Sequence, residues 1–247
     1  MPLRLLLTSA AALSIFATGA FAQSSLRPVA SRPVLELFTS QGCSSCPPAD
    51  VLFKSYVGRS DVIALSMPVD YWDYLGWKDT LASPKFSKRQ RTYASARGDG
   101  QVYTPQIVIN GRAHVVGSSR GDVENALKAA AASPSQVAMK IGMSNGNIEI
   151  ELPASAASSS TDMMVWLAVV QAEVQVDVRA GENRGRKLTY VNVVRDLVPA
   201  GVWNGKAMTI RHQASALTSN PTDRIAVLVL SGTGGALVAG AWIEPTS

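Results

Sequence analysis

Cys43 and Cys46 are the only cysteines in the 247-residue sequence, and two residues separate them. A Cys-x-x-Cys pair supports thiol–disulfide exchange, metal binding or haem attachment, but haem attachment needs a His where this sequence has Pro47. A tetrahedral zinc site needs four ligands, and the histidine candidates are His114 and His212, one in each half of the chain, with no second cysteine pair. The pair therefore favours redox chemistry without a metal or cofactor, and zinc or copper binding stays open as the alternative.

In thiol–disulfide exchange, we expect Cys43 to be the exposed attacking sulfur and Cys46 the resolving one. Proline is tolerated in the first turn of a helix, so Cys46 is the expected N-cap of a helix that begins at Pro47. We expect the backbone N–H groups of Ser45 and Cys46, and the serine hydroxyls, to point at the Cys43 sulfur. Because the thiolate is the nucleophile, such donors would lower the pKa of this thiol moderately.

The elements that must position the pair alternate between strand and helix as far as about residue 132. Patterning predicts strands at 33–38, 61–66, 106–110 and 114–116, and helices from residue 47 and at 84–97 and 123–132. The order β-α-β-α-β-β-α implies parallel pairing first and an antiparallel hairpin later. A Cys-x-x-Cys between the first strand and the first helix is the placement of a thioredoxin-like active site. Residues 33–133 are therefore predicted to form an α/β thioredoxin-like domain.

Two further positions are predicted to serve the dithiol. Thr104 and Pro105 directly precede the third strand, where thioredoxin-like folds carry a cis-proline against the Cys-x-x-Cys and pair the preceding backbone with the substrate chain. We therefore expect a cis Thr104–Pro105 bond, although cis bonds are rare for X-Pro in general. Glu36 lies on the strand that leads to Cys43. It is either a buried proton acceptor below the dithiol or a residue on an exposed sheet face.

The segment 70–77 is rich in aromatic residues and follows the second strand. Loops at the carboxyl ends of parallel strands line ligand crevices. The predicted substrate-contacting wall consists of Tyr71, Trp72 and Trp77, together with Thr104. The alternative is that these rings pack over the dithiol or against the second half of the chain.

Two basic segments are interpreted as solvated surface. The helix at 84–97 carries Lys85, Lys88, Arg89, Arg91 and Arg97, with Phe86 and Tyr93 turned inward. The turn at 180–185 is flanked by Arg179, Arg184, Arg186 and Lys187, which could alternatively hold an anionic group.

The character of the chain changes after Ser133-Pro134-Ser135. Strands joined by clusters of turn residues follow, at 137–141, 147–151, 163–178, 187–194, 207–211, 224–230 and 236–243. Such a series predicts an all-β domain, an antiparallel sandwich or barrel, over residues 134–247.

Residues 1–22 are typical of a secretory signal peptide, with Arg4, an apolar run and the small-x-small end Ala20-Phe21-Ala22. Residues 23–32 then form a short leader, and the mature protein is expected in the periplasm or outside the cell, where a disulfide is stable. Without Arg4, 22 basic and 18 acidic residues remain, a net charge of +4 that is too small to imply nucleic acid. No later segment of the sequence has 18 apolar residues in a row, so we expect no membrane contact after cleavage. A hydrophobic content of 47% and a charged content of 17% exclude a disordered chain.

The segment Leu35–Asp50, LELFTSQGCSSCPPAD, resembles an exported bacterial family within the thioredoxin superfamily, domain-of-unknown-function family 1223. Further similar segments are PVDYWD at 68–73, GW at 76–77, YTPQ at 103–106, GENRGR at 181–186 and NVVR at 192–195. The resemblance covers nearly all of the mature chain. It implies the fold and export, and it implies no reaction.

The leading hypothesis is therefore an exported thiol–disulfide oxidoreductase that acts on protein or small thiols and disulfides. Because the chain has no third cysteine, electrons must pass directly to a separate redox partner. The alternative is a non-enzymatic periplasmic protein whose cysteine pair is a structural disulfide or handles copper.

Overall fold

The structure is a computed structural model that describes residues 26–133, 137–155, 162–220, 222–232 and 234–244. The predicted signal peptide, residues 1–22, lies outside the described residues. Within the described ranges no helix is long and apolar enough to cross a membrane.

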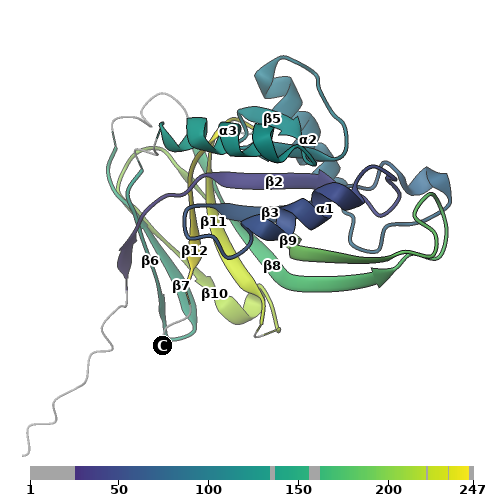
Figure 1. The fold of residues 1–247 in the computed structure, drawn as a ribbon. Coiled ribbons are helices and arrows are strands. Elements are labelled where there is room, and N and C mark those ends of the chain that lie inside the picture. The colour runs from purple at the N-terminus through teal and green to yellow at the C-terminus, as the bar shows by residue number, and fades with distance from the viewer. Residues whose placement is uncertain (1–25, 134–136, 156–161, 221, 233, 245–247) are drawn as a thin grey trace, which may run out of the picture.

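An eight-stranded sheet with the order β12-β11-β8-β9-β3-β2-β4-β5 is the centre of the fold (Figure 1). Its strands are β2 (Val34–Thr39), β3 (Ile63–Pro68), β4 (Gln106–Ile109), β5 (Ala113–Val116), β8 (Met163–Asp177), β9 (Lys187–Trp203), β11 (Arg224–Ser231) and β12 (Leu237–Ile243). β2 pairs in parallel with β3 and antiparallel with β4, which pairs antiparallel with β5. The predicted change from parallel to antiparallel pairing is confirmed.

Helices cover both faces of the β3-β2-β4-β5 part of this sheet. Because strand side chains alternate, Leu35 and Leu37 of β2 pack with α1 (Pro47–Phe53) and α3 (Arg120–Ala131). Val34 and Phe38 face the other way and pack with α2 (Pro84–Arg97). The cysteine-bearing end of α1 and the whole of α2 are therefore on opposite faces of one sheet.

Local signals explain most element ends. The Ser83 side chain accepts a hydrogen bond from the Lys85 N–H at the start of α2, and Gly98 ends that helix in the left-handed region, with φ 78°. Asn110, with φ 49°, begins the turn between β4 and β5. The third helix begins at residue 120 rather than at the predicted 123, because the N–H of Val123 already bonds to the Ser119 carbonyl.

The large sheet runs without interruption across the predicted boundary at residue 134. β9 lies beside β3 through a parallel pair of Ser66 and Val193, and it extends to Trp203 instead of ending at the predicted residue 194. The second half of the chain thus adds strands to the sheet of the first half.

A second sheet, with the order β1-β6-β7-β10, packs on the added strands. Its strands are β1 (Arg27–Val29), β6 (Met139–Ser144), β7 (Asn147–Leu152) and β10 (Met208–Gln213). Their apolar side chains form one core with β8, β11 and β12. The predicted leader at 23–32 is corrected, because its residues 27–29 are a strand paired with β6. Short 3-10 helices lie at Lys54–Tyr56, Asp73–Leu75 and Ala214–Ala216.

Candidate functional site

Cys43 and Cys46 form a disulfide, with 5.4 Å between their Cα atoms, between the end of β2 and the start of α1. Cys46 is the N-cap of α1 and Pro47 its first residue, as predicted. The expectation of an exposed Cys43 is wrong, since Cys43 is 2% exposed and Cys46 is 0% exposed. Within the four-residue motif Cys43–Cys46, the two serines are exposed and the two cysteines are buried.

Hydrogen bonds within the motif agree with the prediction for a serine hydroxyl and differ from it for the Cys46 backbone N–H. The Cys46 N–H donates to the Cys43 carbonyl at 3.2 Å and is not directed at the Cys43 sulfur. The polar group at that sulfur is the Ser45 hydroxyl, with Oγ 3.4 Å from Sγ. The donor available to a Cys43 thiolate is therefore the Ser45 hydroxyl rather than the backbone N–H of Cys46.

The covering hairpin, residues 178–186 between β8 and β9, explains why the disulfide is buried. Its Asn183 is fully buried, and its Nδ2 donates to the carbonyls of Gln41 and Cys43 at 2.9 Å each. Glu182 Oε2 accepts the Ser44 N–H at 3.2 Å. The basic residues around the turn are exposed, as predicted, but the turn as a whole is not solvated surface.

Replacing Asn183 with Ala should open this cover. Two hydrogen bonds to backbone carbonyls disappear, so we expect the free energy of unfolding to fall by about 1–3 kcal/mol. The disulfide should also become more accessible, and its reduction by tris(2-carboxyethyl)phosphine should be faster than in wild type. Asn204→Ala, in an exposed turn of the same half, is the matched control. An unchanged reduction rate in a folded Asn183→Ala protein would contradict the covering role.

The Thr104–Pro105 peptide bond is cis, as predicted. A Cβ added at Gly117 would lie 3.3 Å from the Pro105 Cβ and 3.2 Å from the Ala49 Cβ of α1. The absence of a side chain at Gly117 therefore lets Pro105 lie close to the helix that follows the disulfide. The Gly117 N–H donates to the Pro105 carbonyl at 2.9 Å and holds this loop.

The predicted aromatic residues connect the loops around the disulfide. Trp72 Nε1 donates to Thr104 Oγ1 at 2.7 Å, and the Trp72 Cβ lies 3.1 Å from the place of a Cβ at Gly42. Trp72 thus bridges the cysteine loop and the cis-proline loop. Trp77 Nε1 donates to Gln41 Oε1 at 2.8 Å.

Tyr71 is held from α2, since its hydroxyl donates to Gln90 Oε1 at 3.2 Å. Burial raises the pKa of Tyr71 to about 12, and its side-chain hydrogen bonds with Gln90 and Thr104 oppose this rise. All three predicted aromatic residues are half-buried and have a bonded polar end. Trp72 and Trp77 contact the cysteine loop, whereas Tyr71 packs against α2, and the role of the three rings as a substrate-contacting wall stays a prediction.

Glu36 does not lie below the disulfide. It faces α2, where its Oε1 accepts a 2.7 Å ion-pair hydrogen bond from Arg89 Nε, and its side chain is 0% exposed. The predicted role as proton acceptor for the dithiol is therefore corrected, because α1 packs on the other face of β2. Arg89 and Arg97, interpreted as solvated, are corrected as well, since each has a side chain only 9% exposed.

Asp50 is the buried acid on the disulfide side, and we did not predict it as a site residue. It lies one helical turn after Cys46, and its N–H donates to the Cys46 carbonyl at 3.1 Å, so the two side chains share a helix face. Its carboxylate oxygens are buried without a hydrogen-bond partner among the described residues. The spacing of four residues within a predicted helix was the signal available in the sequence.

The electrostatic surroundings of Asp50 disfavour its charge. Burial raises the pKa of Asp50 well above its usual range, the Thr39 hydroxyl opposes this, and the charge of Asp79 adds to it. The hydroxyls of Thr39 and Tyr190 are likewise buried without a partner among the residues described. Asp50 is therefore suited to hold a proton near the disulfide.

Asp79 organises the loop before Cys43. Its carboxylate accepts the N–H of Gln41 at 2.7 Å and that of Leu81 at 2.8 Å. Burial raises the pKa of Asp79 to about 6, the two backbone donors oppose this rise, and Asp73 adds to it.

The two histidines make their hydrogen-bond contacts with residues outside the cysteine loop. His114 Nδ1 lies 2.9 Å from the Tyr103 hydroxyl, and His212 Nε2 lies 3.3 Å from the Ala200 carbonyl oxygen. Within the described part of the chain, no three His, Cys, Asp or Glu side chains are grouped to hold a metal ion.

Comparison with known proteins places the chain in a family. The family model of DUF1223, proteins of unknown function, matches residues 34–230. An X-ray crystal structure of a structural genomics target from Agrobacterium tumefaciens is 34% identical, with a TM-score of 0.74 over 89% of this chain and 96% of that one. HBP35 of Porphyromonas gingivalis shares the fold alone, with 10% identity and a TM-score of 0.58 over 88% of this chain and 78% of that one. No curated protein matches. The chain belongs to the DUF1223 family of proteins of unknown function.

Proposed function

We propose that this protein is an exported thiol–disulfide oxidoreductase with a thioredoxin-like core. The observation that carries the proposal is the disulfide at the start of α1 beside a cis-proline loop that packs against the same helix. The strand order β3-β2-β4-β5, with one parallel and two antiparallel pairs, supports the thioredoxin-like core. The signal-like residues 1–22 and the Cys43–Cys46 disulfide support export.

The reaction would begin on the oxidised protein. A substrate thiolate attacks Cys43 Sγ, a mixed disulfide forms, and the bond between the cysteines breaks so that Cys46 leaves as a thiolate. Protonated Asp50 gives its proton to Cys46. A second substrate thiolate then attacks the substrate sulfur of the mixed disulfide and releases Cys43. The substrate loses two electrons and the cysteine pair gains them, and an external thiol–disulfide partner reverses the change.

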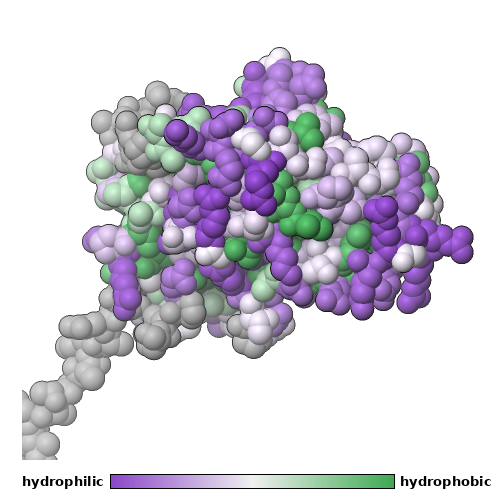
Figure 2. Space-filling view, in the orientation of Figure 1, coloured by the Kyte–Doolittle hydropathy of each residue, from purple (hydrophilic) through white to green (hydrophobic). Residues whose placement is uncertain are grey.

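The surface beside the disulfide suits a polypeptide substrate. Ser44 and Ser45 are exposed, and Val51 of α1 is 76% exposed. Figure 2 shows hydrophobic surface over α1 among hydrophilic neighbours. Because the Cys43 sulfur is covered, the substrate would have to displace the tip of the covering hairpin from the cysteine loop.

The burial of Cys43 favours a second candidate function, a structural disulfide in a binding protein. The two candidates differ in reduction potential, since structural disulfides lie below about −300 mV. We expect the wild-type pair to lie above this value when it is equilibrated with glutathione buffers, trapped by alkylation and analysed by mass spectrometry.

Single-cysteine variants test which sulfur exchanges. With glutathione disulfide, Cys46→Ser should form a mixed disulfide at least about tenfold faster than Cys43→Ser, because the Ser45 hydroxyl, 3.4 Å from Cys43 Sγ, can stabilise the attacking Cys43 thiolate. A potential below about −300 mV, or no mixed disulfide in either variant, would overturn the enzymatic proposal and leave the structural one.

A further inference from the structure

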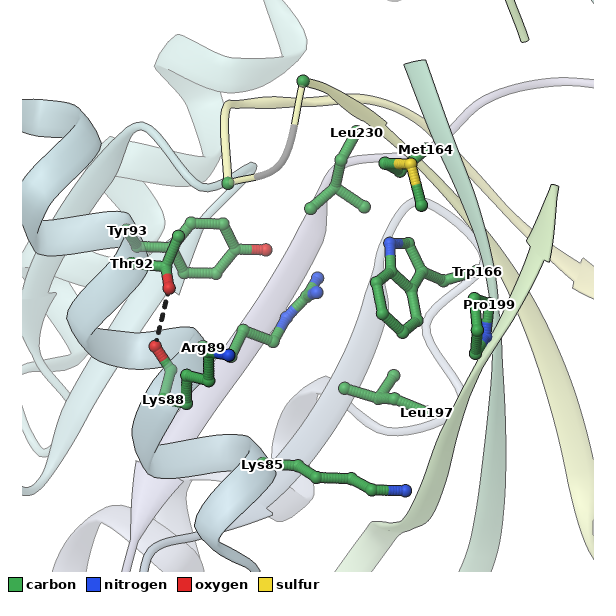
Figure 3. Close-up of a pocket in the computed structure, with 12 residues that line it drawn as sticks. Lys85, Lys88, Arg89, Thr92, Tyr93, Met164, Trp166, Leu197, Pro199 and Leu230 are labelled. Carbon is green, nitrogen blue, oxygen red and sulfur yellow. Dashed lines mark hydrogen bonds between the residues drawn. The ribbon is translucent and has the colours of Figure 1, made fainter. Parts of the chain in front are cut away.

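A cavity lies on the α2 face of the sheet, opposite the disulfide. It has a volume of about 450 Å³ and is enclosed by α2 on one side and by β8, β9 and the end of β11 on the other. This volume is within the roughly 300–1,000 Å³ range of small-molecule sites. Its apolar walls are Met164, Trp166, Leu197, Pro199 and Leu230 (Figure 3).

The polar side of the cavity is basic and comes from α2. Arg89 Nη2 is buried and has no hydrogen-bond partner among the described residues, although Arg89 Nε is bonded to Glu36. Figure 3 shows the guanidinium reaching from α2 toward Leu230 and Trp166, with the Tyr93 hydroxyl directed to the same space. That hydroxyl is also buried and unpartnered within the described ranges. Glu36 Oε2, beside Arg89, is likewise buried and unpartnered among the described residues. Two donors and one acceptor therefore lack partners at the edge of an apolar cavity, and the unpaired donors are costly unless a ligand or water accepts from them.

The charges around the cavity add up to one excess positive charge. Glu36 offsets Arg89, and Asp196 offsets Lys85 through a 2.6 Å ion pair. Lys88, an exposed residue that lines the cavity one position before Arg89, makes no ion pair with any described residue. A ligand that carries one negative charge would therefore balance the site.

We propose that this cavity binds a small monoanionic amphiphile, a carboxylate on an alkyl or aromatic body. The carboxylate would accept hydrogen bonds from Arg89 Nη2 and interact with Lys88. The apolar body would lie against Trp166 and Leu197, where each buried methylene contributes about 0.8 kcal/mol. The inference does not depend on the function of the disulfide, because the two sites occupy opposite faces of the sheet.

The test measures binding of decanoate and of 2-naphthoate to the full chain by isothermal titration calorimetry, with decan-1-ol as the uncharged counterpart of decanoate. We expect saturable one-to-one binding of at least one carboxylate and weaker binding of the alcohol. Lys88→Gln should weaken carboxylate binding about twofold to fivefold, the effect of one exposed and partly screened charge, and leave the alcohol unaffected. Lys128→Gln, an exposed lysine on α3, is the matched control.

A second variant fills the cavity instead of changing its charge. Met164→Trp should weaken binding of all three compounds at least about tenfold, whereas Val116→Trp on β5 at the far edge of the sheet should not. Thermal unfolding without ligand establishes that each variant is folded. Absence of saturable binding of both carboxylates to wild type would overturn the proposal. So would binding that Lys88→Gln and a folded Met164→Trp both leave unchanged.

Discussion

Glu36→Ala is expected to lower the free energy of unfolding by about 3–5 kcal/mol, because it leaves the Arg89 guanidinium buried without its counter-ion. The two side chains are 0% and 9% exposed, so the guanidinium left behind would be largely desolvated. Urea denaturation at pH 7, followed by tryptophan fluorescence, measures the change.

Replacing both partners separates the cost of an unpaired charge from the value of the pair. Glu36→Leu combined with Arg89→Met should be close to wild type in stability, since apolar pairs of similar volume substitute well for buried ion pairs. A loss below about 1 kcal/mol in Glu36→Ala would contradict the buried ion pair. The disulfide exchange rate of Glu36→Gln should equal that of wild type, because Glu36 lies on the α2 face. A tenfold slower exchange in that variant would restore Glu36 as a dithiol residue.

Asp50→Asn is expected to stabilise the oxidised protein at high pH and to slow reduction of its disulfide. An acid whose pKa is raised on folding adds stability below its unfolded pKa, about 3.9. That stability is lost as the pH rises through the folded pKa. Because burial raises the pKa of Asp50, wild type loses stability above about pH 4 and the uncharged variant does not.

The difference in free energy of unfolding between Asp50→Asn and wild type should therefore be small at pH 4 and reach about 1–3 kcal/mol at pH 8. Without a proton donor for the Cys46 thiolate, reduction by dithiothreitol should be about 100-fold slower, the lower range of general acid catalysis. Asp122→Asn, on the exposed first turn of α3, is the control. A stability difference that is independent of pH would refute the buried acid. A pH-dependent difference with an unchanged reduction rate would leave Asp50 buried but without a part in proton transfer.

Local patterns predicted several element ends well. The N-cap at Cys46, the Ser83 cap and the turn at Asn110 depend on residues close in sequence, and all three are present. The cis bond before Pro105 was predicted from its position ahead of a strand. Asp50 could also have been predicted, because a spacing of four residues on a helix places its side chain on the face of Cys46.

Contacts between distant segments were not predictable from single residues. Asn183 bonds to the Cys43 carbonyl across 140 residues, and no property of the turn at 180–185 announces this contact. Glu36 had two possible environments because strand alternation states which residues share a face but not which helix covers it. The pairing of β9 with β3 likewise joined two halves that patterning had separated.

The sequence by itself determined the cysteine pair and the helix that follows it, because these follow from residue types and short-range geometry. The cis bond before Pro105 was expected from thioredoxin-like folds. Only the tertiary structure decided that the pair is covered by a distant hairpin, that Asp50 rather than Glu36 is its buried acid, and that α2 closes a basic, apolar cavity on the other face. Each of these depends on which segments pack together on each face of the sheet, because the burial and the pKa of a side chain are set by its neighbours in the fold.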